Sequence, residues 1–215
     1  MIGINIGCGQ HPTTGWINFD NSPSVRLARM PRLARVLRLL GALSPENMRF
    51  IEFARRHQIR WADATRRIPV PDRSVDAIYS SHMISYLDQP RITRFLAEAR
   101  RVLKPGGVIR LADHDFDAII VRYLQHHDAA RFGEGTFYAF GDLRRSRRAI
   151  LREALYGCRF GCQCFSEVSL CRLLLQAGFQ EPRRMALRET RIAEAGNPSE
   201  TEDREDVLIV EAANV

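Results

Sequence analysis

Two histidines and an aspartate follow apolar runs that have the length of buried strands. His82 comes shortly after Val75–Ser80, and Asp113 and His114 come directly after Val108–Ala112. Ligands of open α/β sheets lie outside the carboxyl ends of the strands, where these side chains are expected. The ordinary pKa of imidazole is about 6.5, so it can take a proton from a hydroxyl group near neutral pH. The sequence therefore predicts His114, His82 and Asp113 as candidate catalytic residues.

A glycine turn and two further aspartates follow three other apolar runs. Gly7-Cys8-Gly9 follows the first predicted strand, Asp20 ends the second and Asp63 ends the third. Glycine has no Cβ, so a ligand can lie directly against its backbone. The carboxylate of Asp20 can accept both hydroxyls of a ribose, and that of Asp63 can accept from an adenine amino group. This set predicts a site for an adenosine that carries no pyrophosphate.

Other nucleotide motifs fit this stretch less well. The dinucleotide fingerprint G-x-G-x-x-G opens a helix, but Pro12 occupies the position of its third glycine. Only Gln10–Gly15 separate Gly9 from the next strand, so we expect the first crossover helix to be missing or much reduced. Without a helix N-terminus there is little dipole to hold a pyrophosphate. No G-K-[ST] follows either, which excludes a Walker A loop.

Strands and helices alternate along the chain, which indicates an α/β fold with a mostly parallel sheet covered on both faces. The last two predicted strands are separated only by a loop, which predicts an antiparallel pair. The predicted strands are Met1–Ile6, Trp16–Asp20, Ile59–Ala64, Val75–Ser80, Val108–Ala112, Met185–Thr190 and Asp206–Ala212. The predicted helices are Ser22–Ala42 with a break near Pro31, Pro45–Gln58, Gln89–Leu103, Leu143–Leu155 and Glu167–Ala177.

Five segments in this order resemble the motifs of class I S-adenosylmethionine-dependent methyltransferases, in the branch called methyltransferase type 11. INIGCG resembles the first motif and GWINFD the acidic second motif. The segment WADATRRIPVPDRSVDAIYSSHMISYL is similar to the third and fourth motifs, and EARRVLKPGGVIRLAD and FSEVSLCRLLLQAGF are similar to later ones. The resemblance covers most of the chain. It implies a Rossmann-like, doubly wound fold and a single methyltransferase domain over residues 1–215, with variable insertions at about 22–58 and 115–165.

The resemblance also implies S-adenosyl-L-methionine as the cofactor and a role for each matching residue. Gly7, Cys8 and Gly9 would pass beneath its methionine part, Asp20 would bind the ribose, Asp63 with Ala64 would bind the adenine, and Ser80, Ser81 and His82 would line the methyl-donor side. The chain departs from the family in two ways. Many relatives carry Glu-His where this chain has Ser85-Tyr86, and the chain starts at the first strand, without the N-terminal helices that often close over the substrate.

The acceptor is predicted to be a small molecule, such as a sugar, glycan or secondary metabolite with a hydroxyl or amine. The signatures of DNA methyltransferases and the double-glutamate loop of protein arginine methyltransferases are absent. An aromatic and arginine-rich segment would suit an anionic acceptor; it comprises Tyr123, Phe132, Phe137, Tyr138, Phe140, Arg144, Arg145, Arg147 and Arg148. The alternatives are a nucleic-acid-directed methyltransferase, which the arginine excess would favour, and a non-catalytic accessory protein that keeps the fold.

Composition bounds the remaining expectations. The net charge of +7 is carried almost entirely by arginine, since Lys104 is the only lysine. No apolar run approaches the roughly 20 residues of a membrane span, and no signal peptide is visible, so a cytoplasmic location is expected. The spacing of Cys158, Cys162, Cys164 and Cys171 matches no common zinc pattern, and no metal is predicted. A homodimer is possible, and the sequence does not decide the oligomeric state.

Overall fold

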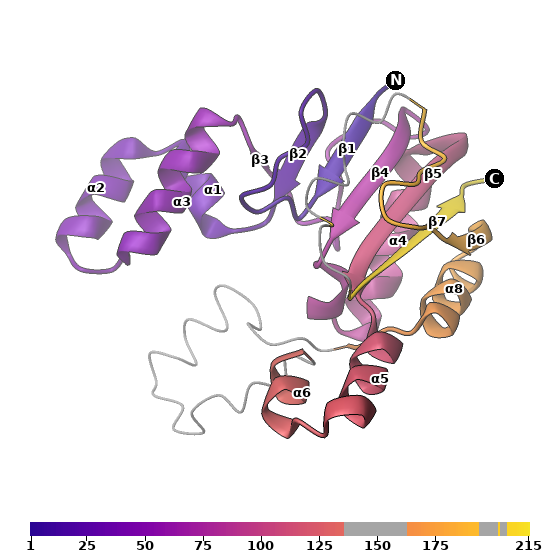
Figure 1. The fold of residues 1–215 in the computed structure, drawn as a ribbon. Coiled ribbons are helices and arrows are strands. Elements are labelled where there is room, and N and C mark those ends of the chain that lie inside the picture. Colours follow the sequence, from indigo (N-terminus) through magenta and orange to yellow (C-terminus); the bar gives the residue numbers. More distant parts are fainter. Residues whose placement is uncertain (136–162, 194–201, 203–205) are drawn as a thin grey trace.

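The computed structural model describes residues 1–135, 163–193, 202 and 206–215, and its centre is one seven-stranded sheet (Figure 1). The strand order is β3-β2-β1-β4-β5-β7-β6. All neighbouring pairs are parallel except those of β7, which runs antiparallel to both β5 and β6. The strands are β1 (Gly3–Ile6), β2 (Ile17–Asp20), β3 (Arg60–Trp61), β4 (Val75–Ser81), β5 (Leu103–His114), β6 (Gln180–Arg184) and β7 (Val207–Ala213). The predicted fold class is therefore confirmed.

Several of the described helices begin directly after a capping side chain. The side chains of Ser44, Asp88 and Ser166 each accept a hydrogen bond from the first turn of the helix that follows. Pro31 divides the predicted helix over 22–42 into α1 and α2, because a proline is accepted in a first turn but not in a helix interior. The helices are α1 (Pro23–Ala28), α2 (Pro31–Leu39), α3 (Pro45–Arg56), the 3-10 turn η1 (Ile84–Tyr86), α4 (Gln89–Val102), α5 (Phe116–His126), α6 (Ala129–Gly135) and α8 (Glu167–Gln176). The predicted helix over 143–155 lies outside the described residues.

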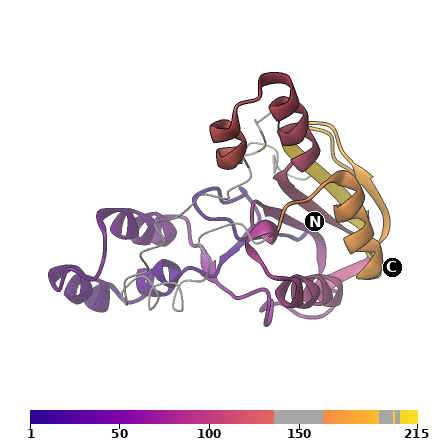
Figure 2. The same ribbon diagram turned by 90° about the horizontal axis from the view of Figure 1, so that it is seen from below.

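One face of the sheet is buried under α4 and α8, which lie close together in both ribbon views (Figures 1 and 2). Phe95 and Leu96 of α4 and Leu170 of α8 are fully buried against Ile109 and Val210 of the sheet. The period of about 3.6 residues in α4 and the alternation along β5 bring these apolar side chains to one layer. This core fixes β4 and β5, whose carboxyl ends carry the candidate catalytic residues. None of the helices in the described part of the chain is long and apolar enough to cross a membrane.

Among the residues that the structure describes, the opposite face of the central strands is covered by side chains from loops and strands, and by no helix. Trp16, Ile192 and Ile209 pack there against Tyr79 of β4 and Ala112 of β5. Helices α1 to α3 form a separate apolar cluster beyond the β3 edge, on the left of Figure 1. The segment that joins β2 to β3 is thus a helical unit of its own, at the position of the predicted first insertion.

Position 3 in β1 requires a glycine, because the indole ring of Trp16 lies directly over it. A Cβ built on Gly3 would overlap the ring atoms of Trp16. We expect Gly3→Ala to lower the free energy of unfolding by about 1–3 kcal/mol, because the well-packed ring must move. Urea unfolding would measure this. Gly133→Ala is the matched control, since a Cβ there meets no atom within 4 Å and alanine favours a helix. If both variants unfolded at the wild-type urea concentration, the packing argument would be wrong.

Three predicted strands have wrong boundaries. The third is Arg60–Trp61 and not Ile59–Ala64, so Asp63 lies two residues beyond its end. The other two errors lie in the C-terminal half of the sheet. The sixth strand is Gln180–Arg184 and not Met185–Thr190. It is an exposed edge strand with a register shift and a left-handed residue, Glu181 (φ 48°), so its residues show no apolar alternation. The segment after it turns back at once, where Glu189 N–H donates to the carbonyl of Ala186. Strand β5 is longer than Val108–Ala112, because Lys104-Pro105-Gly106-Gly107 belongs to the strand and does not merely end the helix.

Candidate active site

The connection between β1 and β2 is a loop with no helix, as predicted. Gly7 and Gly9 both have positive φ angles, 71° and 51°, which suit glycine. The side-chain amide of Asn5, which is buried in β1, donates to the carbonyl of His11 at 3.1 Å and to Thr13 Oγ1 at 3.0 Å. Asn18 of β2 bonds both the N–H and the carbonyl of Thr13. These two asparagines hold the loop at the carboxyl edge of the sheet in place of a crossover helix.

Asp20 connects this loop to the end of β2. Its Oδ2 accepts from Gly9 N–H at 3.1 Å and its Oδ1 accepts from Ser22 N–H at 2.8 Å. Burial raises the pKa of the carboxyl group above its ordinary value, although the two N–H donors act in the opposite direction. A carboxylate oxygen has two lone pairs, so each oxygen can accept one further hydrogen bond. Asp20 therefore sits against the glycine turn with acceptor capacity for two hydroxyls.

Asp63 lies next to Asp20 along the sheet edge. The N–H of Ala62, the residue before it, donates to the carbonyl of Asp20 at 3.2 Å. Oδ1 of Asp63 accepts from Thr65 N–H at 3.0 Å and from Thr65 Oγ1 at 2.7 Å, and Oδ2 lies 3.5 Å from Arg66 Nε. Asp63 thus forms a local turn, and only Oδ2 is without a hydrogen bond from Thr65. Ala64 is buried.

Cys8 lies inside the glycine turn and packs under α1. Its side chain belongs to the apolar cluster formed with Val25 and Ala28. Burial, helped by the charge of Asp20, raises the pKa of the thiol to about 12. The thiol is therefore neutral near neutral pH, which argues for a packing role and against a role as a nucleophile.

The two serines at the end of β4 differ in their surroundings. Ser80 is buried, and its hydroxyl donates to the carbonyl of Ile6 at 2.9 Å, so it ties β4 to β1. The hydroxyl oxygen of Ser81 is also buried but has no hydrogen-bond partner among the described residues. Ser81 is thus the serine with bonding capacity left for a ligand.

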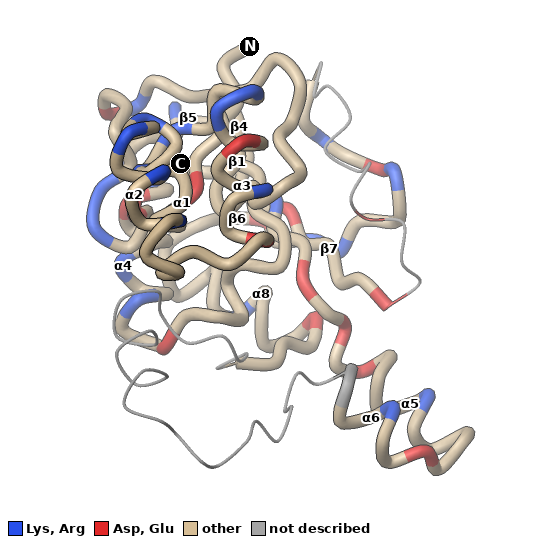
Figure 3. The backbone as a smooth tube through the Cα atoms, turned by 90° about the vertical axis from the view of Figure 1, so that its left-hand side faces the viewer, with Lys and Arg blue, Asp and Glu red and all other residues tan. Residues whose placement is uncertain are grey.

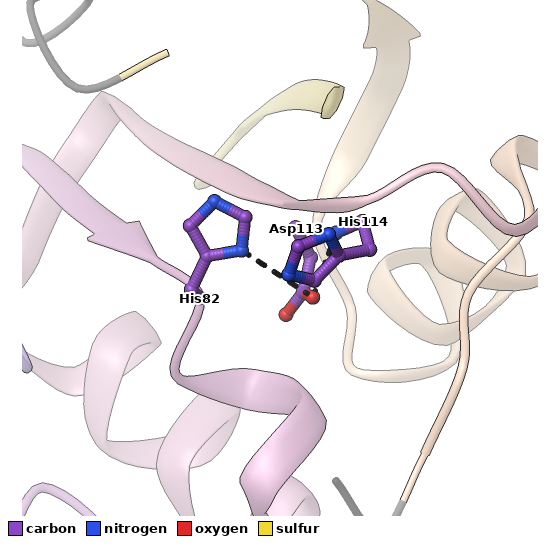
Figure 4. A group of neighbouring side chains, drawn as sticks. All are labelled: His82, Asp113 and His114. Carbon is purple, nitrogen blue, oxygen red and sulfur yellow. Dashed lines mark hydrogen bonds and ion pairs between the residues drawn. The ribbon is translucent and has the colours of Figure 1, made fainter. Parts of the chain in front are cut away.

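The three candidate catalytic residues converge at the ends of β4 and β5 (Figure 4). His82 Nδ1 lies 4.0 Å from Asp113 Oδ1, and the rings of His82 and His114 are 4.3 Å apart between centroids. One ligand atom from each side chain lies within 4.8 Å of those of the other two. Asp113 is 1 % exposed, and burial raises the pKa of its carboxyl group. The grouping follows from the register, because His82 N–H donates to the carbonyl of Ala112 at 2.8 Å.

The turn η1 contributes residues to which the sequence assigned no role. The N–H of Ser85 donates to Asp113 Oδ2 at 3.2 Å. The pKa of Tyr86 is raised by burial and then by the charge of Asp113. The side chain of Met83 lies 2.8 Å from where a Cβ on Gly7 would be, so the turn also touches the glycine loop. Ser85-Tyr86, the pair at which the chain departs from the family motif, thus contacts the candidate catalytic cluster through Ser85.

Comparison with known proteins agrees with this geometry. The family model described as a methyltransferase domain matches residues 4–111, about half of the chain. A malonyl-[acyl-carrier protein] O-methyltransferase of Hahella chejuensis is 34 % identical over 112 residues, which are 48 % of this chain and 33 % of that protein. An uncharacterized 37.1 kDa protein in transposon TN4556 of Streptomyces fradiae is 28 % identical over 127 residues, 56 % of this chain and 32 % of that protein. The chain thus spans about a third of the length of these curated relatives.

Solved structures share the fold at low identity. A S-adenosylmethionine-dependent methyltransferase of Thermotoga maritima, described as a possible histamine N-methyltransferase, superposes with a TM-score of 0.54 at 18 % identity, covering 100 % of this chain and 82 % of that one. Another from Methanosarcina mazei gives 0.52 at 19 % identity, covering 99 % and 92 %.

The sheet order, the antiparallel β7 and the glycine turn beside Asp20 define a class I S-adenosylmethionine-dependent methyltransferase domain. The chain belongs to the methyltransferase-domain family whose model it matches. The family and the cofactor S-adenosyl-L-methionine, both predicted from the motifs, are thereby confirmed. The described residues fit this cofactor, since a Cβ on Gly9 would meet no atom within 4 Å and Asp20 retains acceptor capacity beside it.

Proposed function

We propose that the protein transfers the methyl group of S-adenosylmethionine to a hydroxyl group of a small-molecule acceptor. The observation that carries the proposal is the position of the cluster of His82, Asp113 and His114. Met83, the neighbour of His82, touches Gly7 of the cofactor loop, so the cluster lies beside the predicted methyl-donor side. S-adenosylmethionine supplies an activated methyl group, so the protein mainly has to align the acceptor and accept its proton.

The burial of the three side chains suggests different roles. His82 and His114 are partly exposed, whereas Asp113 is buried. We therefore assign the imidazoles to contact with the acceptor and Asp113 to the orientation of His82. An imidazole within hydrogen-bond reach of a hydroxyl can act as its general base. Gly7, Cys8 and Gly9, with Asp20, Asp63, Ala64, Ser80 and Ser81, remain the proposed cofactor-binding set, in which Cys8 and Ser80 would act through packing.

The names of the relatives leave the attacked atom open, because one is an O-methyltransferase and the other a possible N-methyltransferase. We prefer a hydroxyl oxygen as the attacked atom because the cluster of His82, Asp113 and His114 offers a base. A neutral amine needs less help from a base than a hydroxyl does.

Arginines of the helical unit beyond β3 support an anionic acceptor. Helices α1, α2 and α3 carry many arginines, which are drawn blue in Figure 3. No acidic residue occurs between Asp20 and Glu46, a stretch that contains five arginines: Arg26, Arg29, Arg32, Arg35 and Arg38. The guanidinium of Arg26 lies 3.6 Å from the ring centroid of Trp61, next to β2. The same charge is the one observation that favours nucleic acid as a second candidate acceptor. The homodimer and the cytoplasmic location stay predictions.

A screen with methyl-labelled S-adenosylmethionine would test the proposal. We expect label in small hydroxylated or anionic acceptors, and a loss of about 100-fold in kcat for His114→Ala. His57→Ala is the matched control, because His57 is exposed and stacks on Phe53 at the end of α3. Labelled nucleic acid, with binding that weakens steeply with salt, would favour the second candidate instead. Cofactor binding without any labelled acceptor would point to the accessory protein.

A further inference from the structure

The carboxylate of Asp113 is a buried acidic group that is held by backbone N–H groups and by the side chain of Ser85. It accepts two backbone N–H groups, from Ser85 at 3.2 Å and from His114 at 2.8 Å. Its one ion pair in the described part of the chain is with His82 at 4.0 Å, which is longer than a hydrogen bond. A buried charge is ordinarily paired closely or bound to a metal.

The backbone of His82 is held in an unusual conformation that directs its ring to this carboxylate. Its φ is 47°, in the left-handed region that a histidine adopts infrequently. The hydrogen bond from its N–H to Ala112 fixes it there, and Figure 4 shows its imidazole directed towards Asp113. Backbone strain of this kind persists where the surroundings enforce it and is often found at functional sites.

We propose that His82, Asp113 and His114 bind a divalent first-row transition metal ion beside the methyl donor. Two imidazoles and one carboxylate are the donor set of metal sites that leave several coordination positions open. Their ligand atoms already lie within 4.8 Å of one another, close to the roughly 3–3.5 Å that separates the ligand atoms of a coordinated ion. The His82 side chain is 28 % exposed, so the open positions would face the solvent and an acceptor.

With the ion bound, His82 and His114 would serve as ligands, and the ion instead of an imidazole would activate the acceptor hydroxyl in the proposed methyl transfer, on which this step rests. A hydroxyl oxygen of the acceptor bound to the ion loses its proton more readily, and that proton passes to solvent. The oxygen then forms the bond to the methyl carbon while the carbon–sulfur bond breaks, leaving a neutral thioether. The inference departs from the sequence-based expectation of no metal, which considered the cysteines and not these side chains from two strands.

Titration of the chelator-treated protein with Co²⁺, followed by calorimetry and by the visible absorption of the bound ion, tests this inference. We expect one Co²⁺ per chain, and at least tenfold weaker binding in His82→Ala and in Asp113→Asn. His57→Ala and His126→Ala, at the C-terminal ends of α3 and α5 and outside the cluster, should bind as the wild type does. His82 is partly exposed, so His82→Ala remains informative if Asp113→Asn fails to fold.

No binding, or binding that both cluster variants retain, would overturn the metal site. So would methyl transfer at the full rate by the metal-free protein, a result that leaves the proposed function standing. Conversely, Co²⁺ binding that requires the cluster, in a protein that methylates no acceptor, would support the metal site and defeat the proposed function.

Discussion

Replacing Asp20 by alanine is expected to weaken the binding of S-adenosylmethionine by about 100-fold or more. The carboxylate can accept both ribose hydroxyls, and hydrogen bonds to a charged group contribute about 1.5–3 kcal/mol each. The same change removes the acceptor of Gly9 N–H, so the glycine turn also loses an anchor. Isothermal titration calorimetry with the cofactor or its demethylated product would measure the loss.

Two variants sharpen this test. Asp20→Asn keeps one acceptor oxygen and should give an intermediate loss. Asp76→Asn is the control. Asp76 lies near the start of β4, far along the strand from the candidate site, where it pairs with Lys104 and accepts from Ile2 N–H. If Asp20→Ala bound the cofactor as tightly as Asp76→Asn does, the assignment of Asp20 to the ribose would be wrong.

The raised pKa of Asp20 adds a pH dependence to the same prediction. Burial disfavours the charged carboxylate, so the pKa of Asp20 is higher than the ordinary aspartate pKa of 3.8. A protonated carboxyl group accepts hydroxyl hydrogen bonds poorly, so cofactor affinity should fall as the pH decreases through that raised pKa. Asp20→Asn should remove this part of the pH dependence, because its amide does not titrate.

The fold and the cofactor loop could be predicted because their signals are local in sequence. Gly7, Gly9 and Asp20 lie within 14 residues, and the alternation of strands and helices fixes which ends share one edge. The short connection of ten residues between β1 and β2 leaves no room for a full helix. His82 and Asp113 were grouped for the same reason, because β4 and β5 are parallel neighbours.

Other features depend on pairings that no short pattern reveals. The sixth strand escaped prediction because an exposed edge strand has no apolar face to alternate. Ser80 and Ser81 look equivalent in sequence, yet only Ser80 faces the β1 carbonyl. The backbone contact from Ser85 to Asp113 requires the conformation of η1, which the residue types alone do not specify.

The same limit applies to Arg110, which lies fully buried in β5 between two glutamates. Its guanidinium donates to Glu202 at 3.1 and 2.6 Å and to Glu211 of β7 at 2.8 Å. It also donates to the backbone carbonyl of Glu189 at 2.8 Å. The partners lie 79 to 101 residues away in sequence, so no spacing could indicate them. Burial disfavours the charge of Arg110, but the two glutamates outweigh this and raise its pKa.

We expect Arg110→Met to lower the free energy of unfolding by about 3–5 kcal/mol, because two buried carboxylates lose their main counter-charge. Glu211 would retain the hydroxyl of Thr190 and the N–H of Arg191, whereas both hydrogen bonds of Glu202 in the described part of the chain come from Arg110. For a chain of this size the melting temperature should fall by roughly 6–20 °C. Urea unfolding and thermal denaturation would measure both quantities.

A combined variant separates the charge from the packing. Arg110→Met with Glu202→Gln and Glu211→Gln removes all three charges at similar volume, so it should recover much of the stability that Arg110→Met loses. Arg101→Met is a control, because Arg101 pairs with Glu98 and Asp72 at a more exposed site, where ion pairs contribute less. If the triple variant were as unstable as Arg110→Met, the loss would come from packing. The Arg110 network would then stabilise the pairing of β5 with β7 through packing, and its charges would contribute little to the stability of the fold.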